Sequence, residues 1–253
     1  MSIEYYVEED IAWITLKSPG VMTLETLRTL RNSIEDAGRD GRVNFIVVKG
    51  SGRFFSVGAD LKHVADADSP DDAMQLFIEL AGVFKTLLNS PKITILAYNG
   101  DAYGGGSELL WAADLSVAVR GVRLVWPEAK WGLIPPALST IGATLVGPAR
   151  ASMLALTNGY LTAEELHHIG LISRLVDRPD MLDDAVRELI GLIRSSSPVA
   201  AKEVIRHVRA SKLVLMKQLD AAMETLARLS ATTLARNSAL LFKDRKEPSY
   251  EWV

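Results

Sequence analysis

Residues 93–114 constrain the fold of this chain more than any other segment. The segment begins with the apolar run ITILAY, passes through a turn into three consecutive glycines, Gly104 to Gly106, and continues as an apolar stretch that contains Glu108. This pattern is typical of a buried strand, a loop and the start of a helix. Consecutive glycines favour a loop whose backbone is closely approached, and the free amides of a helix start favour negative charge. We therefore expect a strand, a loop and a helix whose N-terminal amides bind an anionic group.

A second unit of the same kind comes earlier in the chain. Residues 45–48 form a short apolar run typical of a strand buried on both faces, and a glycine-bearing loop over residues 50–61 leads into a short helix. A helix over about residues 73–88 connects this unit to the strand at residue 93. Because strands and helices alternate, we expect the two strands to be parallel neighbours with their glycine loops at one edge of a sheet.

The remaining segments complete an alternating α/β pattern with a helical C-terminal part. Residues 65–72 are small, acidic and turn-forming, which predicts a mobile surface loop. The other expected elements are a hairpin over 3–17, a helix capped by Thr23 and ending near 37, strands over 115–119 and 171–176, and helices over 149–157, 163–169, 182–194, 198–210 and 213–232.

Composition excludes several classes of function. The net charge of −3 over 253 residues gives no basic field for nucleic acid, and the absence of cysteine excludes disulfides and thiolate chemistry. The first residues resemble no signal peptide, and no run of eighteen apolar residues predicts a membrane span. The four histidines, adjacent His167 and His168 and isolated His63 and His207, favour no metal site. We expect a cytoplasmic protein without a metal, a nucleic-acid partner or a membrane anchor.

The two glycine loops can serve a common purpose. If Gly58-Ala59 and Gly104 to Gly106 end neighbouring parallel strands, each can direct one backbone amide at the same oxygen and form an oxyanion hole. The alternative is that both are only tight turns between a strand and a helix. Neither loop continues as a dinucleotide fingerprint, a phosphate-binding loop or a nucleophile elbow.

Two glutamates lie in apolar surroundings. Glu108 precedes the run LLWAA, and Glu128 follows Pro127 between two tryptophans. Apolar neighbours raise the pKa of a carboxyl group towards the range useful for proton transfer, so the pair can share acid and base work. The alternatives are an ordinary carboxylate of a first helical turn and a salt-bridged surface glutamate.

Three segments together resemble the signature segments of the enoyl-CoA hydratase/isomerase (crotonase) superfamily. They are RFFSVGADL at residues 53–61, NGDAYGGGSEL at residues 99–109, and Pro127-Glu128 twenty residues after Glu108. The resemblance extends over nearly the whole chain. It implies an α/β fold in which residues 1–195 form a crotonase-type spiral of ββα units. Residues 196–253 are then a helical region for trimerisation and closure of the coenzyme A (CoA) site.

The resemblance also implies an activity. Ala59 and Gly105 match the two oxyanion-hole amides of the family, and Glu108 and Glu128 match its two catalytic glutamates. The implied enzyme is a lyase, an enoyl-CoA hydratase that converts 2-enoyl-CoA reversibly to 3-hydroxyacyl-CoA. It needs no cofactor, since CoA is part of its acyl-CoA substrate, and it assembles as a homotrimer or a dimer of trimers. Contacts with CoA are expected at Gly20, Val21, Ala59, Leu61, Phe242 and Arg245.

Departures from the family pattern leave other reactions open. Thr23 stands where the family usually has asparagine, and Gly20-Val21 lacks the common basic residue. Pro136, in the segment IPPALST, replaces a family glycine whose N–H lies beside the catalytic water, and proline has no N–H to donate. The alternatives are Δ3,Δ2-enoyl-CoA isomerisation, which needs chiefly the glutamate matching Glu128, hydrolysis or decarboxylation of a CoA thioester, and a non-catalytic scaffold subunit.

Overall fold

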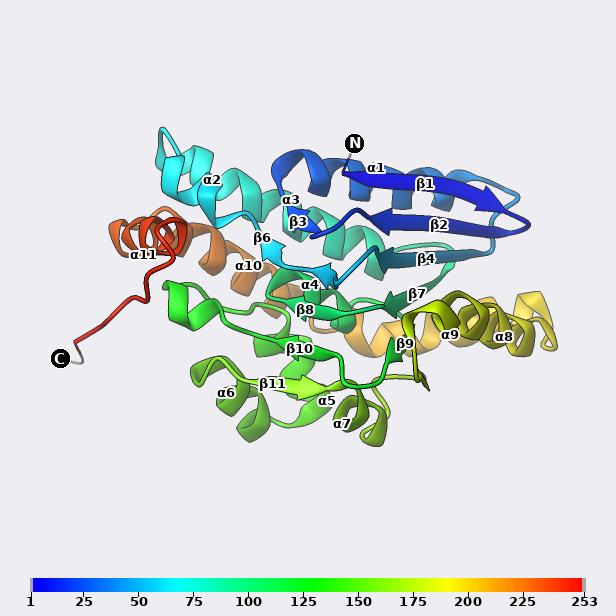
Figure 1. The fold of residues 1–253 in the computed structure, drawn as a ribbon. Helices are drawn as coiled ribbons and strands as arrows, with labels where there is room; N and C mark the ends of the chain where they lie inside the picture. The colour runs from blue at the N-terminus through cyan, green and yellow to red at the C-terminus, as the bar shows by residue number, and fades with distance from the viewer. Residues whose placement is uncertain (1, 252–253) are drawn as a thin grey trace.

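A six-stranded sheet forms the framework of the protein. The computed structural model describes residues 2–251, and the strand order of this sheet is β1-β2-β4-β7-β9-β12 (Figure 1). β1 and β2 pair antiparallel as the predicted hairpin, and the other neighbours are parallel. The predicted parallel pairing of the strands at residues 45 and 93 is confirmed. The strands are β1 (Ile3–Glu8), β2 (Ile11–Leu16), β4 (Phe45–Gly50), β7 (Ile93–Tyr98), β9 (Leu115–Val119) and β12 (Arg174–Val176).

Short strands that follow those of the first sheet build a second layer. They form a four-stranded sheet in the order β11-β10-β8-β5 and a two-stranded sheet of β3 and β6. Because β5, β8 and β10 each follow a strand of the first sheet, the predicted spiral of ββα units is confirmed. The sequence analysis missed these strands because two or three residues are too few to show a period. They are β3 (Val21–Met22), β5 (Phe54–Ser56), β6 (Gly58–Ala59), β8 (Asp101–Tyr103), β10 (Arg123–Val125) and β11 (Tyr160–Thr162).

Two long helices cover the first sheet. α1 (Leu24–Arg39) begins at Thr23, whose Oγ1 accepts a hydrogen bond from Thr26 N at 3.1 Å, as predicted. α3 (Pro70–Leu88) begins with Ser69 as its cap. The predicted mobile loop over 65–72 is therefore wrong, since α2 (Leu61–Asp66) and α3 are separated only by residues 67–69. Two acidic residues of that segment, Asp71 and Asp72, lie in the first turn of α3, where their charge interacts favourably with the helix dipole.

The rest of the described chain is mostly helical. The predicted strand over 171–176 is shorter, because β12 begins only at Arg174, and α11 (Thr233–Lys243) was not predicted. The preceding helix ends at Ser230, and Thr232 caps α11, which packs beside α2 (Figure 1). The other helices are α4 (Gly105–Glu108), α5 (Ala143–Val146), α6 (Pro148–Leu156), α7 (Ala163–His168), α8 (Leu182–Arg194), α9 (Pro198–Leu213) and α10 (Met216–Ser230). No helix within residues 2–251 is long and apolar enough to span a membrane.

The expected boundary at residue 195 falls in the short connection between α8 and α9. That residues 196–253 serve oligomerisation and closure of a CoA site stays a prediction.

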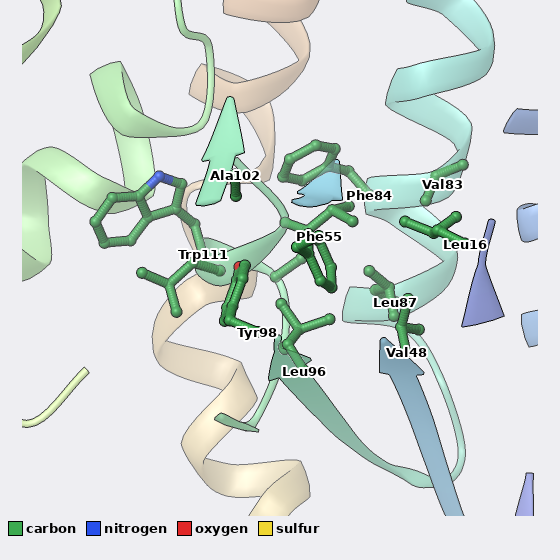
Figure 2. Packing of buried hydrophobic residues seen from close by; sticks show 14 of the residues in the cluster. Leu16, Val48, Phe55, Val83, Phe84, Leu87, Leu96, Tyr98, Ala102 and Trp111 are labelled. Atoms are coloured by element: carbon green, nitrogen blue, oxygen red, sulfur yellow. The ribbon is translucent and has the colours of Figure 1, made fainter. Parts of the chain in front are cut away.

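An aromatic and aliphatic core joins the two sheets to α3. Figure 2 shows Phe55 of β5 beside Tyr98 of β7, with ring centroids 4.5 Å apart. Phe84 and Leu87 of α3 are fully buried in the same cluster. The first glycine loop follows β5 and the second follows β8, whose Ala102 belongs to the same cluster, so the core fixes both loops relative to one another.

Candidate active site

A mostly apolar cavity of about 400 Å³ lies where the two glycine loops meet. The loop after β5 contributes Gly58 and Ala59, and the start of α4 contributes Gly104 and Gly105. The short 3₁₀ turn Glu128–Trp131 forms the facing wall. Apolar side chains of α3, α10 and α11, namely Phe77, Leu80, Leu226 and Phe242, complete the lining. The four residues predicted for catalysis, Ala59, Gly105, Glu108 and Glu128, thus border one cavity.

Glycine is required at two positions of these loops. Gly58 has φ +88°, and a Cβ there would lie 2.7 Å from the Tyr103 carbonyl oxygen. Gly104 has φ +49°, and a Cβ there would lie 3.2 Å from Glu128 Oε1. Only a residue without a side chain permits this close approach. The residues that follow these glycines, Ala59 and Gly105, therefore both line the same cavity. Their role as an oxyanion hole stays a prediction.

Glu108 is a buried carboxylate held by neutral donors. Its exposed fraction is 1%, and its Oε2 accepts a hydrogen bond from Ala137 N at 2.6 Å. Its Oε1 accepts from Leu138 N at 2.9 Å and from Trp111 Nε1 at 3.3 Å. Burial raises the pKa of Glu108 from 4.5 to about 7, although these donors favour the charged form and oppose the shift. Glu108 can therefore gain or lose a proton near neutral pH.

Glu128 presents a carboxylate oxygen without a partner. The residue is half-buried, but its Oε2 is covered and accepts no hydrogen bond. The alternative of a salt-bridged surface glutamate is therefore wrong. Burial raises the pKa of Glu128 well above its usual range, and the negative charge of Glu108 raises it further. Since two neighbouring carboxylates resist carrying charge together, ionisation of Glu108 favours the protonated form of Glu128.

The segment after Pro136 supplies donors that the sequence analysis did not find. Pro136 itself borders the cavity, and the amides of the next two residues, Ala137 and Leu138, bind Glu108. Trp111 was also missed as a partner of Glu108. Its spacing of three residues, which places side chains on one face of a helix, is the signal that could have found it.

The residues predicted to contact CoA divide into two groups. Ala59 and Leu61 border the cavity, as does Phe242, which packs edge-on against Trp131 with centroids 5.1 Å apart. The other three do not line it. Val21 pairs with Gly58 behind the first loop, the Gly20 carbonyl accepts a hydrogen bond from Ser56 Oγ, and Arg245 follows α11. Contact of these six residues with CoA stays a prediction.

No group of three or more metal-ligating side chains that could hold an ion occurs in the described part of the chain.

Replacing Glu108 should change how stability depends on pH. Because the folded-state pKa of Glu108 is raised, its protonated form stabilises the fold at low pH, and this contribution is lost as pH rises from 4.5 to about 7. The loss amounts to about 3 kcal/mol. We expect Glu108→Gln, which carries no charge, to gain about that much stability relative to the wild type between acidic pH and about pH 8. Urea unfolding at several pH values measures this, and parallel curves for both proteins would contradict it.

Comparisons with known proteins point to a single family. The family model described as enoyl-CoA hydratase/isomerase matches residues 7–252. YngF of Bacillus subtilis, an enoyl-CoA hydratase/isomerase by name, is 30% identical over 246 residues, which are 94% of this chain and 90% of that protein. Carnitinyl-CoA dehydratase of Escherichia coli K12 is 33% identical over 174 residues, 66% of this chain and 65% of that protein. This chain thus spans slightly less than two thirds of that dehydratase.

Solved structures show the same fold. An enoyl-CoA hydratase from Mycobacterium avium subsp. paratuberculosis superposes with a TM-score of 0.87 at 21% identity, covering 99% of both chains. DspI of Pseudomonas aeruginosa is 31% identical over 83% of this chain and 87% of its own, with a TM-score of 0.76.

Proposed function

Because this chain belongs to the enoyl-CoA hydratase/isomerase family, we propose that it catalyses the reversible hydration of a 2-enoyl-CoA to a 3-hydroxyacyl-CoA. The observation that carries the proposal is the pair of covered carboxylates, Glu108 and Glu128, in the apolar cavity that Ala59 and Gly105 also line. An apolar cavity suits the acyl chain, and the carboxylate pair suits the addition of water.

The proposed reaction uses the asymmetry of the carboxylate pair. The amides of Ala59 and Gly105 donate to the thioester oxygen and stabilise the negative charge of the enolate. Glu108, the more acidic partner, takes a proton from water while the water oxygen bonds to the β-carbon. Glu128 then gives its proton to the α-carbon, so that one proton leaves water and one enters the product.

A second candidate is the isomerisation of 3-enoyl-CoA to 2-enoyl-CoA. Pro136 borders the cavity without an N–H for a water molecule, and both oxygens of Glu108 already accept backbone hydrogen bonds. Glu128, whose Oε2 is free of partners, would then carry the proton between the α- and γ-carbons alone. No specific observation among residues 2–251 favours thioester hydrolysis, decarboxylation or a scaffold role.

An assay with two substrates separates the candidates. We expect the wild-type protein to hydrate crotonyl-CoA, followed as loss of enoyl-thioester absorbance, and Glu108→Gln to lower that rate by about 10²–10⁴-fold. Isomerisation is followed with a 3-enoyl-CoA. If only the 3-enoyl-CoA reacts and Glu108→Gln retains that rate, isomerisation by Glu128 replaces hydration. Binding of CoA esters without turnover of either substrate would reject both reactions.

We further propose that the protein is a homotrimer or a dimer of trimers. Exposed apolar side chains of α8 and α9, Leu192, Val199, Val204 and Val208, support an interface at this end of the molecule. Light scattering should give about three or six times the chain mass of 27.6 kDa, and a monomer would reject the proposal.

A further inference from the structure

We propose that Trp111 and Trp126 are positioning residues, which act as a stacked indole pair to hold the Glu108 carboxylate in its reactive orientation. This inference rests on the proposed function, because it assumes that Glu108 transfers protons. Both indoles are fully buried, and neither belongs to the residues predicted for catalysis or CoA binding. They come from the segments that carry the two glutamates, since Trp111 follows Glu108 by three residues and Trp126 precedes Glu128 by two.

The direct contact is made by Trp111. It ends the 3₁₀ turn Leu109–Trp111 that follows α4, and its Nε1 donates to Glu108 Oε1 at 3.3 Å. An indole N–H can only donate, so it favours the ionised carboxylate. With the amides of Ala137 and Leu138 it makes three donors on one carboxylate, which restricts rotation of the group. The orientation of Glu108 therefore depends on a side chain as well as on the backbone.

Packing holds the Trp111 ring in place. The rings of Trp111 and Trp126 stack with centroids 5.6 Å apart and planes 26° apart. Gly142 lies against the Trp111 ring, where an added Cβ would come 3.0 Å from Cε2. Gly142 closes the π-helical turn Leu138–Gly142, whose first residue also donates to Glu108. Trp111 is thus packed by the segment that binds the carboxylate and by the segment that leads to Glu128.

Trp126 adds a second indole N–H to this region. Its Nε1 is buried and makes no hydrogen bond within normal geometry, yet the indole is among the groups that lower the pKa of Glu108. A small movement of the carboxylate towards Trp126 would pair this N–H. Trp126 therefore provides a second donor, which can hydrogen-bond to the Glu108 carboxylate when it is ionised.

Few titratable groups act on Glu108. Glu128 faces it from the 3₁₀ turn, and Tyr98 of β7 is a fully buried phenol whose pKa is raised by burial and by the charge of Glu108. Lys130, at the cavity wall, pairs with Glu247. The π-helical turn contributes no titratable side chain. A change in the titration of Glu108 on removal of Trp111 therefore reports mainly the lost indole N–H.

Trp111→Phe is the test, because phenylalanine keeps an aromatic ring and loses the donor. The pKa of Glu108 should rise by roughly one pH unit, since a hydrogen bond to the charged form is removed. The acidic limb of the pH profile of kcat/KM for crotonyl-CoA should move up by the same amount. Trp126→Phe should shift it in the same direction by less. Trp13→Phe is the matched control, because Trp13 is fully buried with an unpaired Nε1 but lies in β2, stacked on Tyr6.

A spectroscopic titration without substrate makes the test independent of the activity. The ultraviolet difference spectrum of tryptophan should titrate with a midpoint of about 7 in the wild type and in Trp13→Phe. The signal should vanish in Glu108→Gln and shrink in Trp111→Phe. If crotonyl-CoA is not hydrated but the titration behaves this way, the positioning role stands and the proposed hydration fails. If Trp111→Phe keeps the wild-type midpoint and pH profile and loses only stability, the indole contributes only to core packing and the inference is overturned.

A second variant covers the case in which Trp111→Phe does not fold. Gly142→Ala places a methyl group against the Trp111 ring and should displace the indole from Glu108. The midpoint of about 7 should then move upward, and an unchanged midpoint in this folded variant would overturn the inference.

Discussion

Glu128→Gln is expected to lower kcat for crotonyl-CoA hydration by about 10²–10⁴-fold, while KM changes little. Glutamine has nearly the size of glutamate, so the cavity wall should remain, but a carboxamide cannot carry a proton to the α-carbon. The Oε2 of Glu128 has no hydrogen-bond partner, so the change breaks no hydrogen bond at that oxygen. Initial rates of absorbance loss over a range of substrate concentrations measure both constants.

The matched control is Glu224→Gln. Glu224 is exposed on α10, the helix whose Leu226 borders the cavity. This variant should keep the wild-type kcat, and circular dichroism should show that both variants are folded. Wild-type kcat in folded Glu128→Gln would exclude Glu128 as the proton carrier.

The sequence predicted the parts of the fold that have a clear period or a clear cap. The hairpin at β1 and β2 and the start of α1 at Thr23 follow from local pattern, and the pairing of β4 with β7 follows from the alternation of strands and helices. The short strands β5 and β8 could not be predicted, because three residues are too few to show a period. The acidic run before α3 was misread as a loop, since Asp and Ser favour both turns and helix starts.

The candidate site was predicted in its residues more than in its interactions. Glu108 and Glu128 stood out because charge in apolar sequence is unusual, and the structure places both at one cavity. The amides of Ala137 and Leu138 could not be foreseen, since backbone N–H groups have no identity in sequence. Pro136 has no N–H to donate, but the next two residues, Ala137 and Leu138, each donate one to Glu108.

A buried ion pair ties the C-terminal helices to the segment that carries Glu108. Arg209 of α9 is 5% exposed, and its Nε donates to Asp114 Oδ1 at 2.6 Å. Its Nη2 donates to the Lys92 carbonyl at 2.7 Å, just before β7. Asp114 lies three residues after Trp111 and also accepts from Thr94 N at 2.8 Å. The pair thus joins α9, the start of β7 and the segment that follows the 3₁₀ turn Leu109–Trp111.

Arg209→Met should lower the free energy of unfolding by about 3–5 kcal/mol, because it leaves the Asp114 carboxylate buried without its counter-charge. Urea unfolding at one fixed protein concentration measures the change. Adding Asp114→Asn to Arg209→Met removes the stranded charge, so the double variant should recover part of the loss. Arg206→Met is the control on the same helix, since exposed Arg206 pairs with Glu203, and it should change stability by no more than about 1 kcal/mol. Equal free energies of unfolding for the two single variants would show that the Arg209–Asp114 ion pair stabilises the fold no more than a surface ion pair does.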